Sequence, residues 1–182
     1  MTGYGIAASY LGLPDAGLAT YSDMVGRAHA IATGTRTPLI ADGDTGYGGL
    51  LNVDFTVRGY EAAGVQAIQI EDQEFPKKCG HTPGRRVIRI EDAVRKSRVA
   101  VAARSSRVVL IIARTDARSS LGLDEALRRA EAFATAGADI LFVESPESAA
   151  DMVRIGRAFD RPLVATMVEG GRTPIKDRKS VV

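Results

Sequence analysis

The stretch Pro38-Leu39-Ile40-Ala41-Asp42-Gly43-Asp44 places a short apolar run directly before two carboxylates. Similar junctions recur along the chain, where apolar runs at residues 67–70, 108–113 and 140–143 precede the charged residues Glu71 and Asp72, Arg114 and Asp116, and Glu144. None of these runs alternates strictly between apolar and polar residues, so each is predicted to be a strand buried on both faces, as in a parallel sheet. A fifth strand is predicted at residues 162–165 and a sixth at residues 1–6.

Amphipathic segments between these runs predict helices. Their ranges are 21–32, 54–63, 90–104, 124–136 and 147–159. The second and fourth are followed by Gly64 and Gly137, and glycine suits the left-handed cap that ends many helices. Strands that alternate with helices indicate a βα repeat, which forms either a barrel or a doubly wound sheet.

The charged residues after four successive strands favour the barrel. Parallel strands of a closed barrel direct their carboxyl ends to one shared mouth, whereas in a doubly wound sheet only the strands at the switch point meet. A complete barrel takes about 250 residues, and this chain has 182. We therefore expect an α/β fold of the TIM-type (β/α)8 barrel kind that is incomplete, with about six βα units.

The composition excludes several classes of protein. With 24 Lys and Arg against 22 Asp and Glu, and 5% aromatic residues, the chain lacks the basic surface typical of nucleic-acid binding. No apolar run approaches the length of about 18 residues that spans a membrane, and no secretory signal follows Met1. We therefore expect a cytoplasmic protein without nucleic-acid or membrane partners. The single cysteine excludes an internal disulfide and a four-cysteine zinc site.

Three carboxylates are candidates for a metal site. Asp42 and Asp44 lie two residues apart at the end of one strand, and Glu71 ends the next strand. Carboxylates so close together repel each other unless a cation or a proton lies between them, and oxygen ligands suit Mg²⁺ or Mn²⁺. The alternative is an Asp/Gly turn that caps the following helix.

A long polar loop at residues 73–89 contains Lys77-Lys78-Cys79-Gly80-His81. A loop of this length after a strand is typical of a lid. Lysine and histidine beside a thiol would lower its pKa and make Cys79 a usable acid or nucleophile. The alternative is a solvated basic loop with an incidental cysteine.

Arg114 and Glu144 are single charges that follow apolar strands. Arg114 could bind a substrate carboxylate through two parallel hydrogen bonds. It could equally pair with Asp116 or with Glu144, and the sequence alone leaves both readings open.

Seven motifs in order give the chain a resemblance to the isocitrate lyase/phosphoenolpyruvate mutase superfamily, from Thr2 to about Pro174. They are Thr2-Gly3-Tyr4-Gly5, Gly12-Leu13-Pro14-Asp15, Asp42-Gly43-Asp44-Thr45-Gly46-Tyr47-Gly48, Ile70-Glu71-Asp72-Gln73, Lys77-Lys78-Cys79-Gly80-His81, Ala113-Arg114-Thr115-Asp116 and Met167-Val168-Glu169-Gly170-Gly171-Arg172-Thr173-Pro174. The cysteine-containing motif resembles the lyase branch, which includes 2-methylisocitrate lyase, dimethylmalate lyase and oxaloacetate hydrolase.

The resemblance implies roles for the marked residues. Mg²⁺ or Mn²⁺ would be held by Asp42, Asp44 and Glu71. Small carboxylic acid substrates would be bound by Thr2, Gly3, Tyr4, Gly80, Glu144 and Thr166. Cys79, Arg114 and His81 would be catalytic, with the Cys79 thiol protonating the enolate-like product after a carbon–carbon bond is cleaved.

The sequence also departs from the family pattern. Thr166 stands where the lyases usually carry a substrate-binding asparagine. The first βα unit and the C-terminal helices that relatives exchange within homotetramers are expected to be missing. Residues 1–174 are therefore expected to form a partial barrel domain, and residues 175–182 a tail unrelated to the family.

The expected function is a Mg²⁺-dependent lyase that cleaves a 2-hydroxy di- or tricarboxylic acid of the 2-methylisocitrate type into an α-keto acid and a carboxylic acid. Two alternatives stay open. One is an oxaloacetate hydrolase or dimethylmalate lyase of the same superfamily, and the other is a truncated remnant without activity.

Overall fold

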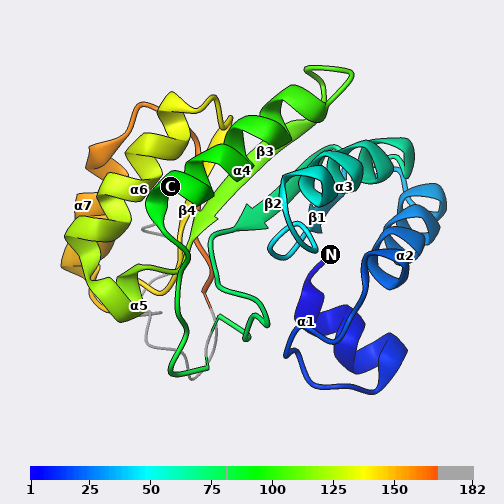
Figure 1. The fold of residues 1–182 in the computed structure, drawn as a ribbon, viewed down its shortest axis with the longest axis horizontal. Helices are drawn as coiled ribbons and strands as arrows, with labels where there is room; N and C mark the ends of the chain where they lie inside the picture. The colour runs from blue at the N-terminus through cyan, green and yellow to red at the C-terminus, as the bar shows by residue number, and fades with distance from the viewer. Residues whose placement is uncertain (81, 168–182) are drawn as a thin grey trace.

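The protein forms one parallel sheet of five strands in a computed structural model that describes residues 1–80 and 82–167 (Figure 1). The strands are β1 (Ile40–Asp42), β2 (Ala67–Glu71), β3 (Leu110–Thr115), β4 (Ile140–Val143) and β5 (Leu163–Val164). All five were predicted from their apolar runs, with ends that differ by at most two residues.

The strand order distinguishes the two candidate architectures. Each strand pairs with the next one along the chain, from β1 to β5, and every pairing is parallel. A doubly wound sheet reverses its order at a switch point, and this sheet has no reversal. The order is that of a (β/α) barrel, with five consecutive strands in the described residues.

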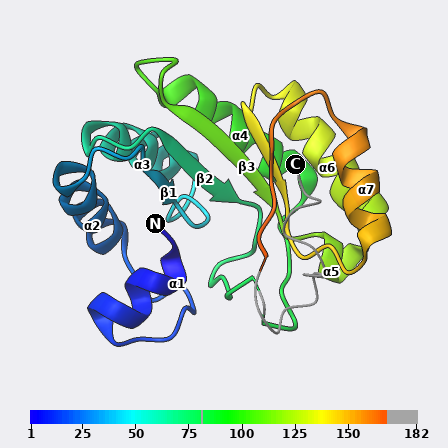
Figure 2. The ribbon, with the colours of Figure 1, turned by 180° about the vertical axis from the view of Figure 1, so that it is seen from behind.

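Helices cover the sheet in chain order. They are α2 (Tyr21–Gly34), α3 (Leu50–Ala62), α4 (Ile90–Ala103), α6 (Leu123–Thr135) and α7 (Ala149–Ala158), preceded by α1 (Gly3–Ile6) and the π-helical turn η1 (Ala7–Leu11), with the short α5 (Arg118–Leu121) before α6. Figure 1 shows α2, α3, α4, α6 and α7 following one another around the sheet. Figure 2 shows, from behind, that α1 lies on the same side as the loop between β2 and α4.

The sixth predicted strand, at residues 1–6, is wrong. Only Met1 pairs with the sheet, because its amino group donates to the Ile40 carbonyl and its carbonyl accepts from the Asp42 amide. From Gly3 the chain is helical, because the Thr2 side-chain oxygen accepts a hydrogen bond from the Gly5 amide and caps the first turn.

Helix α3 begins four residues before its predicted start at residue 54. The Asn52 side chain accepts a hydrogen bond from the Gly49 amide at 3.0 Å, which satisfies a donor at the start of the helix. The short helices α1 and α5 and the turn η1 were not predicted, since four or five residues carry too little periodicity to be recognised.

The apolar core has two main parts that meet at the sheet. One lies under α2, α3 and α4, around Met24, Val57 and Ile68, and the other lies under α6 and α7, around Phe133 and Leu141. No helix among residues 1–80 and 82–167 is long and apolar enough to cross a membrane.

Candidate active site

A cavity of about 510 Å³ opens at the carboxyl ends of the strands. Nine of the residues marked from the sequence line it: Thr2, Tyr4, Asp42, Glu71, Cys79, Gly80, Arg114, Glu144 and Thr166. Gly3 and Asp44 lie beside this lining, in contact with Asp42 and Lys77 respectively. His81 lies outside the described residues, so its role stays a prediction.

Asp42 and Asp44 are held close together by the backbone around them. Asp42 accepts hydrogen bonds from the Asp44 amide at 3.1 Å and from the Gly3 amide at 2.9 Å, while the Gln69 amide group donates to it at 3.4 Å. A Cβ atom on Gly3 would lie 3.0 Å from an Asp44 oxygen and 3.1 Å from an Asp42 oxygen. A side chain at this position would therefore crowd the two carboxylates, and glycine lets α1 approach them closely.

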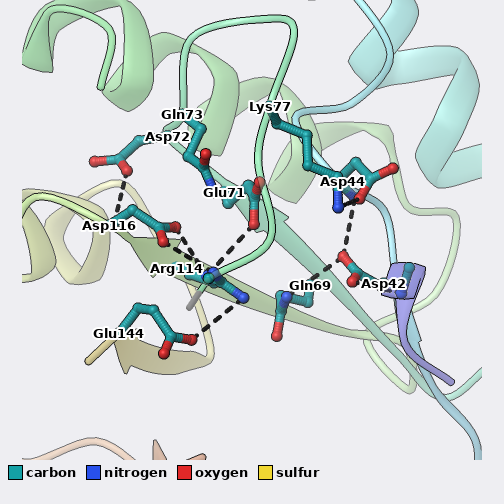
Figure 3. Close-up of polar contacts among 12 residues, drawn as sticks. Asp42, Asp44, Gln69, Glu71, Asp72, Gln73, Lys77, Arg114, Asp116 and Glu144 are labelled. Carbon is teal, nitrogen blue, oxygen red and sulfur yellow. Dashed lines mark hydrogen bonds and ion pairs between the residues drawn. The ribbon is translucent and has the colours of Figure 1, made fainter. Parts of the chain in front are cut away.

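Lys77 supplies positive charge to this carboxylate pair. Its Nζ atom lies 2.7 Å from Asp44 Oδ1, and both of these side chains are buried (Figure 3). The same Nζ atom lies 2.5 Å from Asp15 Oδ1. Burial and the negative charge of Asp42 raise the pKa of Asp44 to about 7, although Lys77 opposes the shift. Burial would lower the pKa of Lys77, but the charges of Asp44, Asp42 and Glu71 outweigh it and raise this pKa.

Glu71 is buried between the carboxylate pair and Arg114. Its Oε2 atom lies 3.4 Å from Arg114 Nε, whereas Oε1 is buried and has no hydrogen-bond partner in the described part of the chain. Burial raises the pKa of Glu71 well above its ordinary value, and the positive charge of Arg114 only partly offsets this. A buried carboxylate oxygen without a partner is costly unless a proton or a cation satisfies it.

These three carboxylates fit a divalent cation by their chemistry. They are oxygen donors of the kind that Mg²⁺ binds. Glu71 Oε1 has no hydrogen-bond partner in the described part of the chain, and the Lys77 ammonium beside Asp44 is shared with Asp15. Across residues 1–80 and 82–167, no three His, Cys, Asp or Glu side chains are already arranged as a cation cage. In the observed geometry the Lys77 ammonium partly takes the place of such a charge.

Arg114 is surrounded by carboxylates (Figure 3). Asp116 accepts two hydrogen bonds from it, from Nε and from Nη2, both at 2.9 Å. Glu144 Oε2 lies 3.3 Å from Nη1, and the Phe142 ring centroid lies 5.1 Å from the guanidinium carbon. Both pairings that the sequence left open are therefore present, and the guanidinium also lines the cavity.

The loop that carries Cys79 lies against the cavity. Cys79 is half-buried, and its amide donates to the Asp15 carbonyl at 3.2 Å. The Gln73 side chain both donates to the Lys78 carbonyl and accepts from the Lys78 amide, which holds the loop backbone. Both lysine ammonium groups bind elsewhere than at the thiol, since Lys77 pairs with carboxylates and Lys78 donates to the Gly84 carbonyl.

Gly80 brings this loop into contact with the charged centre. A Cβ atom at Gly80 would lie 2.6 Å from Arg114 Nη2 and 3.2 Å from the Glu144 carboxyl carbon. The Ser145 hydroxyl donates to the Gly80 carbonyl at 3.1 Å. The loop can lie this close to Arg114 only because residue 80 has no side chain.

One charged residue turns away from the mouth that the sequence analysis assigned to it. Asp72 follows Glu71, and successive strand residues point to opposite faces, so Glu71 faces Arg114 while Asp72 faces the helix layer (Figure 3).

The sequence does not reveal three further residues of the site, which are Asp15, Gln73 and Arg85. Asp15 lies in a quoted motif, but only the folded chain brings it to Lys77.

The comparisons with known proteins show the family of the chain. The family model "Phosphoenolpyruvate phosphomutase" matches residues 1–180. The chain is 53% identical over 175 residues to the 2,3-dimethylmalate lyase of Eubacterium barkeri, covering 96% of this chain and 61% of that protein. It is 47% identical over 164 residues to the 2-methylisocitrate lyase of Aeropyrum pernix, covering 90% of this chain and 53% of that protein.

Solved structures show the same fold. The structure of oxaloacetate acetylhydrolase in complex with the inhibitor 3,3-difluorooxalacetate matches with a TM-score of 0.93 and 39% identity, covering 96% of this chain and 61% of that one. Phosphonopyruvate hydrolase in complex with oxalate and Mg²⁺ matches with a TM-score of 0.77 and 36% identity, covering 88% and 57%. The chain thus spans roughly three fifths of the length of these relatives, and its five-stranded sheet corresponds to part of their barrel.

Proposed function

Because the chain belongs to the phosphoenolpyruvate mutase/isocitrate lyase superfamily, we propose that it contributes the active site of a Mg²⁺-dependent carbon–carbon lyase. The substrate would be a 2-hydroxy di- or tricarboxylic acid, which is cleaved into an α-keto acid and a second carboxylic acid. The observation that carries this proposal is the cavity that Arg114, Asp42, Glu71, Glu144 and the Cys79 loop line together.

Arg114 would stabilise the substrate oxygen at the 2-position. Asp116 fixes its guanidinium through two hydrogen bonds, so the donors are oriented before the substrate arrives. Gly3 and Thr2 would bind the carboxylate beside that oxygen. Asp42, Asp44 and Glu71 would hold Mg²⁺ or Mn²⁺, which when bound supplies a Lewis acid at the same oxygen.

Cys79 would give a proton to the leaving carbon. As the carbon–carbon bond breaks, its electron pair passes to the carbon next to the leaving carboxylate. The 2-hydroxyl would pass its proton to a carboxylate that lines the cavity and become a carbonyl. The thiol proton then completes the second carboxylic acid. Near the carbon that Cys79 protonates, the substrate would also contact Tyr4, Gly80, Glu144, Thr166 and His81.

Two substrate types are favoured by the relatives. The 53% identity is to a protein named 2,3-dimethylmalate lyase, and the 47% identity to one named 2-methylisocitrate lyase. Both names describe acids with a 2-hydroxyl and a branched carbon skeleton, so the proposal takes this class and leaves its member open.

The test is an assay for α-keto acid release from 2,3-dimethylmalate and 2-methylisocitrate, and for oxalate release from oxaloacetate, each with Mg²⁺ or with EDTA. Thermal unfolding under the same conditions reports binding, because a selective ligand stabilises the folded state. Cys79→Ser should retain the stabilisation by ligand and lose about 10²–10⁴-fold in kcat, since a hydroxyl is a far weaker acid. A folded chain that gains no stability with any of these acids, in a full-length version as well, would contradict the proposal.

Three further expectations stay predictions. They are the cytoplasmic location, the boundary at residue 174 between the partial barrel and a separate tail, and the absence from this chain of the C-terminal helices that relatives exchange within homotetramers. Residues 168–182 lie outside the described part of the chain.

A further inference from the structure

We propose that Arg129, on the outer helix α6, is a positioning residue that fixes the orientation of Arg114 through Asp72 and Asp116. The proposal rests on the proposed function for the use of Arg114 as a substrate-binding group. Its basis is an unbroken series of buried hydrogen bonds that runs from the helix layer to the cavity.

The series begins at the cavity with Asp116. This carboxylate is fully buried and accepts both hydrogen bonds from Arg114, one on each oxygen. A carboxylate in this arrangement sets the plane and the direction of the guanidinium. Any rotation of Asp116 would therefore move the donors that face Glu71, Glu144 and the cavity.

Asp72 fixes the backbone from which Asp116 projects. Its Oδ1 atom accepts from the Asp116 amide at 2.9 Å, and its Oδ2 atom accepts from the Thr115 hydroxyl at 2.8 Å. The two hydrogen bonds join the end of β2 to the end of β3, where Glu71 is paired in register with Arg114. Asp72 is 2% exposed, so water does not replace these contacts.

Arg129 supplies the positive charge that Asp72 needs. Its Nη1 atom donates to Asp72 Oδ2 at 2.9 Å, and its Nε atom donates to Glu125 Oε1 at 2.9 Å. Arg129 is 4% exposed, which is unusual for an arginine on a helix that also faces solvent. Without it, Asp72 would be a buried charge without a counter-ion, and a shift of Asp72 would be transmitted to Asp116.

The adjacent residue provides a matched control. Arg128 donates to the same Glu125 carboxylate, at 2.7 and 2.9 Å, but its side chain is 60% exposed. Arg128→Met and Arg129→Met remove the same atoms from neighbouring positions of one helix. Of these two arginines, only Arg129 donates a hydrogen bond to Asp72.

The experiment measures the orientation of Arg114 and the affinity for a small dicarboxylate. The first readout is the Nε–H signal of Arg114 in a ¹⁵N-edited NMR spectrum, assigned by its loss in Arg114→Lys. The second is the dissociation constant of oxalate with Mg²⁺, measured by calorimetry below the unfolding temperature of each variant. If Arg129→Met fails to fold, Arg129→Lys replaces it in both measurements. Lysine keeps the positive charge but cannot donate to Asp72 and Glu125 together.

We expect Arg129→Met to shift the Arg114 signal and to weaken oxalate binding by about tenfold, while Arg128→Met changes neither. In the Arg114→Lys background, Arg129→Met should add less than about a threefold loss, because residues that act through one another are not additive. A lowered melting temperature with an unchanged Arg114 signal and unchanged oxalate affinity would overturn the proposal, as would fully additive losses. If the wild-type chain binds no oxalate, the proposed function fails, and the NMR signal alone decides the role of Arg129.

Discussion

Arg114 illustrates how much of the site depends on single side chains. Its guanidinium contacts Asp116, Glu71 and Glu144, and each contact uses a different combination of nitrogen atoms. Only a planar group with several fixed donors can satisfy such a set at once. The identity of this residue, and not only its charge, is therefore part of the site.

Replacing Arg114 by lysine should thus impair the site although the positive charge is kept. We expect Arg114→Lys to lower kcat/KM by about 10- to 100-fold, because the double hydrogen bond to Asp116 is lost. Steady-state kinetics in a full-length version, with thermal unfolding as a check on folding, measure this effect. Arg118→Lys is the control, since Arg118 pairs with Glu147 and Asp151 outside the cavity. Equal activity of wild type and Arg114→Lys would show that the arginine is only structural.

The sequence identified the residues of the site better than their contacts. Each of the first four strands ends in or is followed by a charged residue that lines the cavity, as the barrel argument expected: Asp42, Glu71, Arg114 and Glu144. The alternation of strand residues predicts that Asp72 lies on the opposite face of the sheet from Glu71. The ion pairs of Lys77 with Asp15 and Asp44 join distant segments, so no local pattern in the sequence could reveal them.

At the scale of the elements, the loop between β2 and α4 depends on Gly80. We expect Gly80→Ala to reduce activity by more than about tenfold while the fold is retained. The added methyl group would lie 2.6 Å from Arg114 Nη2, so the loop could not pack against Arg114 as it does in the wild type. The measurement is kcat/KM together with thermal unfolding.

Gly26→Ala is the matched control for this prediction. Gly26 lies within α2, and a Cβ atom there would meet nothing within 4 Å. This variant should keep full activity and gain about 0.5–1 kcal/mol of stability, as alanine favours the helix. Similar activities of Gly80→Ala and Gly26→Ala would show that the loop has room that the structure does not indicate.

The start of α7 should make stability depend on pH. Ser148 caps this helix, and Asp151 accepts hydrogen bonds from Ser148, the Glu147 amide and Arg118. Although burial acts to raise the pKa of Asp151, these partners lower it below its ordinary value. Its contribution is therefore present above about pH 4 and is lost as the pH falls through the lowered pKa.

Urea unfolding of the wild type and of Asp151→Asn measures this effect. The variant should be less stable by about 1 kcal/mol at pH 7, the usual value of a helix-capping interaction, and the difference should shrink below about pH 4. Asp160→Asn, at an exposed position after the helix, should show no such difference. A constant difference from pH 7 to pH 3 would mean that the Asp151 charge is not responsible.

The elements themselves were predicted where burial imposes a pattern. The five strands were recognised because they are apolar on both faces, and the five long helices because their apolar residues recur at helical spacing. The segment at residues 1–6 was mistaken for a strand, since the deciding contact is one hydrogen bond to the Thr2 side chain. A single capping interaction outweighs a weak propensity in a segment this short.

At the scale of the whole molecule, the sheet should open from one edge. In the described residues β5 has two half-buried residues and pairs only with β4, whereas β3 is buried and pairs on both sides. Amide hydrogen exchange should therefore be faster at Leu163 and Val164 than at Ile111 and Ile112, by about 100-fold or more. Uniform protection across the sheet would indicate that β5 is stabilised by contacts outside the described residues.

The dual use of Asp116 has a consequence for protein engineering. Asp116 binds Arg114 and also accepts a hydrogen bond from Arg85, which lies at the far end of the loop that carries Cys79. A chimera that imported this loop from a relative without an arginine at position 85 would leave Asp116 with one cationic partner in place of two. Such a chimera should therefore transfer residues 73–89 together with the end of β3. A crossover point between these two segments would separate Arg85 from the Asp116 carboxylate that it binds.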